Sequence, residues 1–153
     1  MRGAASPGRR ARLYVAPGLD TAASAALMLH HKGVGYEQRR LPPGVHALAM
    51  VRLGFQSLGE PALVHGPLRV QGTRRIARAL DELVTERQLL PADERCRASV
   101  ERTERWGALF QDATRRLAYC AARRDPGEFA ATIRPRTPRL LVPLAVRLAG
   151  AAQ

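Results

Sequence analysis

The 153-residue chain has a formal net charge of +12 at pH 7, and 46% of its residues are hydrophobic. This length suits one domain, or one small domain with a helical extension, and the apolar content is ample for a core. The longest apolar run, residues 140–149, is interrupted by Pro143 and Arg147 and is too short to span a bilayer, so we expect no membrane partner.

The positive charge is almost entirely arginine, because Lys32 is the only lysine among the 25 basic residues. The arginines are scattered through every segment, and only 5% of residues are aromatic, too few for a platform that stacks bases. We therefore interpret the charge as solvated faces and expect no nucleic-acid site, although the charge favours anionic ligands. The two cysteines, Cys96 and Cys120, are too few for a disulfide scaffold, which fits a reducing cytoplasm.

The first part of the chain predicts a strand, a helix and a second strand. Residues 1–11 are basic without the apolar centre of a signal peptide, so we expect a flexible leader. Residues 12–17 indicate a short strand that ends at a proline. Residues 22–31 are rich in helix formers, with Asp20 or Thr21 as the cap.

Residues 59–83 carry the most informative pattern of the chain. Pro61 opens a short apolar run at 62–64, and a turn of hairpin length at 65–67 leads into a second run at 68–70. Thr73 then stands where a helix N-cap belongs. Apolar residues follow it at helical spacing, namely Ile76, Ala77, Leu80, Leu83 and Val84.

Beyond Leu90 and Pro91 the pattern becomes helical. Residues 92–95 open a long amphipathic helix, and a second helix is expected from Pro126 to about Thr132. Three later prolines, at 135, 138 and 143, are expected to break any long helix. One stripe of the long helix needs a partner surface, and we expect its two cysteines to be buried apolar positions. The stripe comprises Cys96, Val100, Thr103, Trp106 or Gly107, Phe110, Ala113, Leu117 and Cys120.

The order of these segments resembles the glutathione S-transferases. Lys32-Gly33-Val34-Gly35-Tyr36-Glu37 resembles the family's link from first helix to second strand, and Gly59-Glu60-Pro61-Ala62-Leu63 resembles its proline motif. The resemblance implies an α/β fold, with a thioredoxin-like βαβ-ββα domain at residues 12–84. It further implies an interdomain linker at 85–91 and a truncated, partial all-helical domain at 92–153.

The resemblance also implies a site for glutathione as substrate or ligand. The Glu60–Pro61 bond would be cis, with the adjoining backbone on the cysteinyl part of the tripeptide. Thr73 would hold the γ-glutamyl carboxylate, and Gln71 and Gly72 would supply neighbouring contacts. No metal is expected, because the four histidines show no ligand spacing.

The chain departs from the family at the catalytic position, which Leu19 occupies. The family places a Tyr, Ser or Cys there, which donates a hydrogen bond to the thiolate or attacks directly. Leucine has no donor, and Asp20 would raise the pKa of a nearby thiol by like-charge repulsion. Thr21 is the nearest hydroxyl. The short helical region is a second departure, because the family's electrophile pocket lies in that domain.

Two functions therefore remain open. The first is binding of glutathione, or a related thiol, with weak thiol transferase activity. The second is a catalytically degenerate module that keeps the fold for binding or dimerisation. Leu19 and Asp20 favour the module, whereas Pro61 and Thr73 favour retained ligand binding. The expected partners are a small-molecule thiol and a second copy of the chain.

Overall fold

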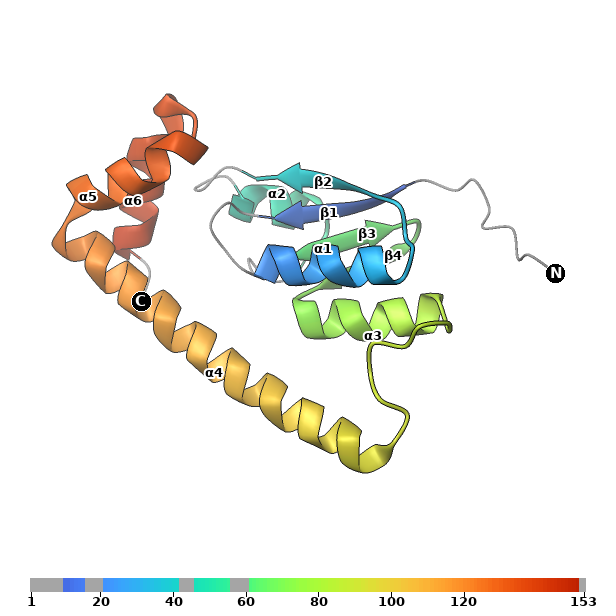
Figure 1. Cartoon of the computed structure of the whole chain (residues 1–153). Helices are drawn as coiled ribbons and strands as arrows, with labels where there is room; N and C mark the ends of the chain where they lie inside the picture. The colour runs from blue at the N-terminus through green and yellow to red at the C-terminus, as the bar shows by residue number, and fades with distance from the viewer. Residues whose placement is uncertain (1–9, 16–20, 42–45, 56–60, 152–153) are drawn as a thin grey trace. The chain divides into compact units, whose positions relative to one another are not determined.

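The computed structural model describes residues 10–15, 21–41, 46–55 and 61–151 (Figure 1). The chain divides into two compact units. One comprises the described parts of Met1–Arg40 and Gly54–Leu89, and the other those of Leu41–Leu53 and Leu90–Gln153. The leader predicted at residues 1–11 lies largely outside the described residues, and β1 begins at Ala11.

The first unit contains a four-stranded sheet of order β2-β1-β3-β4. β1 pairs parallel with β2 and antiparallel with β3, and β3 pairs antiparallel with β4. This arrangement confirms the predicted thioredoxin-like order, a parallel crossover followed by a hairpin. The elements are β1 (Ala11–Val15), α1 (Thr21–His31), β2 (Tyr36–Arg40), β3 (Ala62–His65), β4 (Leu68–Gln71) and α3 (Thr73–Leu83).

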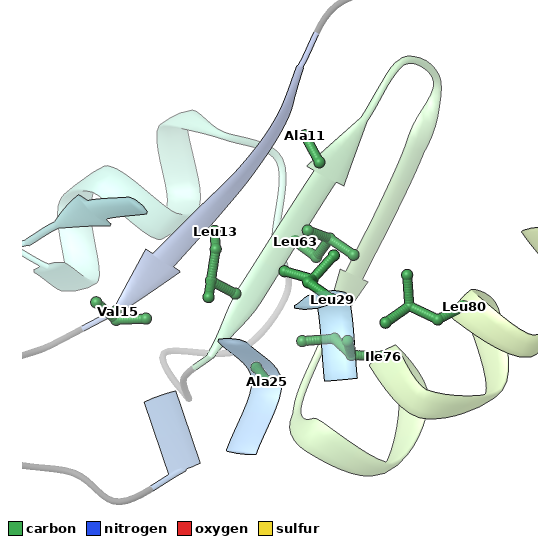
Figure 2. Packing of buried hydrophobic residues seen from close by; sticks show 8 residues of the cluster. All are labelled: Ala11, Leu13, Val15, Ala25, Leu29, Leu63, Ile76 and Leu80. Atoms are coloured by element: carbon green, nitrogen blue, oxygen red, sulfur yellow. The ribbon is translucent and has the colours of Figure 1, made fainter. Parts of the chain in front are cut away.

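The core of this unit lies between the sheet and the two helices α1 and α3. Leu13 of β1 is in register with Leu63 of β3, and both side chains are fully buried. Ile76 and Leu80 lie one turn apart on α3, so their side chains share the face that is packed on the sheet. Figure 2 shows the eight residues of this cluster, to which α1 contributes Ala25 and Leu29.

Lys32, the residue that follows α1, connects the C-terminal end of α1 to that of α3. The side chain of Lys32 is fully buried, and its ammonium is ion-paired with Asp81. The ammonium also donates to the carbonyls of Val84, at 2.8 Å, and Glu86, at 3.2 Å. Asp81 in turn accepts from the backbone N–H of Leu89 at 2.8 Å. The segment after α3, which the sequence predicts as the start of a linker, is therefore held within the first unit.

The second unit is helical. Its elements are α2 (His46–Arg52), α4 (Glu94–Arg124), α5 (Pro126–Ile133), two single 3₁₀ turns at Arg134–Arg136 and Arg139–Leu141, and α6 (Val142–Ala151). The carboxylate of Asp93 caps α4 by accepting from Cys96 N–H at 2.8 Å. Asp125 ends α4 and caps α5 by accepting from Glu128 N–H at 2.8 Å. α5 and α6 pack against α4, and Ala122, Val142 and Ala145 are buried in this unit.

The three prolines after Ile133 interrupt the helices as expected, because α5 ends at Ile133, two single 3₁₀ turns follow, and α6 begins at Val142 with Pro143 in its first turn. A proline in the first turn costs no hydrogen bond, since the amides there have no acceptor within the helix. Cys96 and Cys120 are exposed free thiols, so the expectation that they are buried is wrong. Among the described helices, none is both long and apolar enough to cross a membrane.

Candidate functional site

The candidate ligand site lies where β3, β4 and α3 meet. Pro61 is fully buried immediately before β3, and Gln71 is the last residue of β4. The backbone N–H of Gly72 donates to the carbonyl of Pro61 at 2.7 Å, which continues the ladder that pairs Ala62 with Gln71. This bond holds the proline beside the start of α3. The structure thus brings together four of the predicted ligand-binding residues: Pro61, Gln71, Gly72 and Thr73.

Gly72 forms the turn from strand to helix. Its backbone has φ 87° and ψ 140°, a conformation that residues other than glycine rarely adopt. Its carbonyl accepts from Ile76 N–H at 3.0 Å and so begins the helical ladder. Gly72 is therefore the N-cap of α3, and the expectation that Thr73 occupies that position is wrong by one residue. Thr73 is the first residue of α3, and its side chain is half-buried.

The start of α3 favours an anion. The first backbone amides of a helix have no acceptor within the helix, and they form the positive end of its dipole. No acidic side chain lies in this first turn, and Arg74 and Arg75 there are exposed. A carboxylate could therefore be held by backbone amides together with the Thr73 hydroxyl.

Other predicted site residues fall where the structure gives no description. Leu19, Asp20 and Glu60 lie outside the described residues, and so does the predicted cis bond between Glu60 and Pro61. Thr21 is the first residue of α1, and its side chain is not described. The assignment of the catalytic position stays a prediction.

Two half-buried histidines, His46 and His65, lie in the described structure. In the described parts of the chain, no three His, Cys, Asp or Glu residues are grouped so as to hold a metal ion. Nδ1 of His46 and Nδ1 of His65 are both buried without a hydrogen-bond partner. Burial of the His46 ring lowers its pKa from the usual 6.5, because the charged form loses hydration.

Sequence reasoning missed two features that shape this region. The first is the bond from Gly72 to Pro61, which depends on a positive φ that the residue letters do not show. The second is the buried Lys32–Asp81 pair, whose members are far apart in the sequence. The sequence offers one signal for this pair, which is that Lys32 is the only lysine of the chain. That fact describes the composition and does not by itself predict that the side chain is buried.

Comparison with solved structures supports the thioredoxin-like assignment, whereas no protein-family model and no curated protein matches the chain. A glutathione transferase homolog from Burkholderia (BGR1), solved with bound glutathione, is 25% identical over 64% of this chain and 53% of its own, with a TM-score of 0.55. The Tau class glutathione S-transferase from mango, Mangifera indica, is 19% identical over 93% of this chain and 58% of its own (TM-score 0.57). FzlA from C. crescentus is 21% identical over 92% of this chain and 62% of its own, with a TM-score of 0.61.

These likenesses bear out the predicted resemblance at the level of the fold. The chain is glutathione S-transferase-like, with a thioredoxin-like sheet followed by a helical C-terminal region. It spans about half the length of the first of these proteins, since the coverage of the Burkholderia chain is 53%.

Proposed function

We propose that this chain binds glutathione, or a related low-molecular-weight thiol, at the junction of β3, β4 and α3. The observation that carries the proposal is the 2.7 Å bond from Gly72 N–H to the Pro61 carbonyl. This bond holds the buried Pro61 beside the N-terminus of α3. One of the solved structures with a similar fold contains bound glutathione.

Each part of the site has a role in this proposal. Thr73 and the first amides of α3 hold the γ-glutamyl carboxylate, which the helix dipole favours. The backbone around Pro61, including Glu60, holds the cysteinyl part, and Gln71 and Gly72 supply neighbouring contacts. The net charge of +12 adds a general attraction for an anionic tripeptide.

Thiol transferase activity is weak in this proposal. Activation of the bound thiol needs a hydrogen-bond donor near the sulfur, and the position that would supply it holds Leu19. The neighbouring Asp20 would disfavour the thiolate by like-charge repulsion. We place the protein in the reducing cytoplasm, where its two exposed thiols persist.

Calorimetric titration with glutathione tests the binding site. Thr73→Ala should weaken binding by about tenfold or more, because a hydrogen bond to a charged group is worth roughly 1.5–3 kcal/mol. Thr85→Ala is the matched control, since Thr85 is exposed in the same unit and lies outside α3. It should leave the affinity unchanged.

A second ligand identifies which part of glutathione is recognised. Cysteinylglycine lacks the γ-glutamyl group, so it should bind wild type more weakly than glutathione does. The difference between the two ligands should shrink in Thr73→Ala. Equal affinity of wild type and Thr73→Ala for glutathione would show that α3 does not hold the ligand.

The second candidate function is a catalytically degenerate module that keeps the fold for dimerisation. The exposure of Trp106 and Phe110 on α4, at 72% and 73%, favours it. Absence of glutathione binding together with a stable dimer would support this candidate over the first.

A further inference from the structure

The segment that ends with α6 carries only positive side-chain charge. Glu128 is the last acidic residue of the sequence, and the arginines after it are at positions 134, 136, 139 and 147. Arg134, Arg139 and Arg147 are exposed, and none of the ion pairs in the described structure includes them. Their guanidinium groups are therefore available to an external anion.

Two leucines lie beside these arginines. Within the second unit α6 packs on α4 and α5, and Val142 and Ala145 of α6 are buried. Leu144 and Arg147 are exposed on the other side of α6, and Leu140, in the 3₁₀ turn directly before it, is 93% exposed. Leu140, Leu144 and Arg147 follow one another at spacings of four and three residues, so they share one face. We call these three residues the α6 face.

The charge of the chain itself does not complement the α6 face. The sequence of the first unit contains 12 basic and 6 acidic residues, and that of the second contains 13 and 7, so each unit has a net charge of +6. Neither the first unit nor a second copy of the chain is therefore an electrostatic partner for a segment that carries only arginines. An anionic surface is such a partner.

The α6 face suits a lipid surface better than a nucleic acid. Residues 130–153 contain no aromatic side chain that would stack on a base. Leucines next to arginines instead match the boundary of a bilayer, where acyl chains meet phosphate groups. We propose that α6 docks, through this face, on the surface of a bilayer that contains anionic phospholipids.

In this arrangement α6 lies along the surface and does not cross the bilayer. It has 10 residues, so it is about 15 Å long, roughly half the thickness of the hydrocarbon layer. The expectation of no membrane partner rests on the length of the apolar run, which excludes spanning but not docking on the surface.

Each side chain of this region has a role in the docking. Leu140 and Leu144 enter the layer between headgroups and acyl chains, and Arg139 and Arg147 bind phosphate oxygens. Each arginine near an anionic surface raises the affinity by roughly fivefold, so binding is reversible and weakens as the salt concentration rises.

Co-sedimentation of the full chain with sucrose-loaded vesicles tests the docking. The chain should sediment with vesicles that contain phosphatidylcholine and phosphatidylglycerol in equal parts. It should stay in the supernatant with vesicles of phosphatidylcholine alone, and added sodium chloride should release it from the anionic vesicles. Absence of binding to the anionic vesicles, or equal binding to both kinds, would overturn the proposal.

Paired arginine variants separate this region from the overall charge. Arg139→Gln together with Arg147→Gln should weaken binding to the anionic vesicles by about tenfold or more. Arg102→Gln together with Arg105→Gln is the matched control, since it removes the same charge from exposed positions of α4. It should weaken binding by less than about threefold. An equal loss from both double variants would show that net charge, and not α6, holds the lipid.

A leucine variant distinguishes a bilayer from a nucleic acid. Leu140→Ser should weaken vesicle binding by about fivefold, because the leucine no longer buries apolar surface in the bilayer. Leu109→Ser is the control, since Leu109 is 69% exposed on α4, and it should leave the binding unchanged. Equal effects of the two variants would overturn the proposal.

Binding to duplex DNA provides the competing outcome. A chain that binds the duplex equally well with and without Leu140→Ser, and does not bind anionic vesicles, would assign the arginines to nucleic acid and overturn the proposal. Glutathione enters none of these experiments, so this proposal can fail without the proposed function failing.

Discussion

The buried ammonium of Lys32 is ion-paired with the carboxylate of Asp81, and this contact joins the end of α1 to the last turns of α3. The side chain of Lys32 has no exposed surface, and that of Asp81 is 14% exposed. α3 is also the helix whose first turn carries the candidate ligand site. The pair therefore helps to set the position of that helix on the sheet.

Lys32→Met should lower the free energy of unfolding by about 3 kcal/mol, because it removes the buried ammonium that is ion-paired with the largely buried Asp81 carboxylate. Chemical denaturation followed by circular dichroism measures the loss. Arg39→Gln is the control, since it breaks an exposed pair with Glu37 and should cost less than about 1 kcal/mol. An equal loss from both variants would show that burial does not set the strength of the Lys32 pair.

Gly72→Ala should destabilise the chain by about 1–3 kcal/mol and weaken glutathione binding. No heavy atom lies within 4 Å of the position that a Cβ would take, so the cost is conformational and not steric crowding. It arises from the φ of +87°, which alanine adopts only under strain. The measurement is chemical denaturation together with glutathione calorimetry.

Gly35→Ala is the matched control for this effect. Gly35 also has open space around its Cβ position, but its φ lies outside the positive range. Its replacement should change stability by no more than about 0.5 kcal/mol. If both alanine variants were neutral, the turn at Gly72 would not depend on glycine.

The order of strands and helices could be predicted because its signals are local. The start of the hairpin is marked by Pro61, and its turn is marked by Gly66 and Pro67. Apolar residues that recur at helical spacing mark α3. Four of the five predicted ligand-binding residues lie close together, since Pro61 and residues 71–73 flank the ends of the β3–β4 hairpin, whereas Glu60 lies outside the described residues.

The errors arise where a residue's context decides its role. Cys120 was expected to be buried because the stripe is amphipathic, but periodicity does not show whether a second surface covers it. The Lys32–Asp81 pair depends on tertiary packing, which no local pattern reports.

Stability should fall as the pH drops below about 6.5, and His46 should account for part of the slope. Burial lowers the pKa of His46 in the folded chain, so below pH 6.5 the unfolded chain binds more protons than the folded chain. The contribution is present above that pH and is lost as pH falls towards the lowered value. Urea denaturation at a series of pH values measures the slope.

His46→Gln should flatten this part of the pH profile, because glutamine does not titrate. His30→Gln is the control, since His30 is exposed at the end of α1. It should leave the slope as it is in wild type. A profile that His46→Gln does not change would show that other groups cause the acid sensitivity.

Leu19→Ser should raise the conjugation rate by up to about a hundredfold, because it supplies a hydrogen-bond donor at the predicted catalytic position. The change Asp20→His removes the like-charge repulsion, so the double variant should gain more than either single variant. The measurement is the initial rate with glutathione and a generic aryl halide. Ala23→Ser is the control, because it adds a hydroxyl on an exposed face of α1 and should leave the rate unchanged. Robust turnover by wild type would instead show that another group, with Thr21 the first to test, activates the thiol.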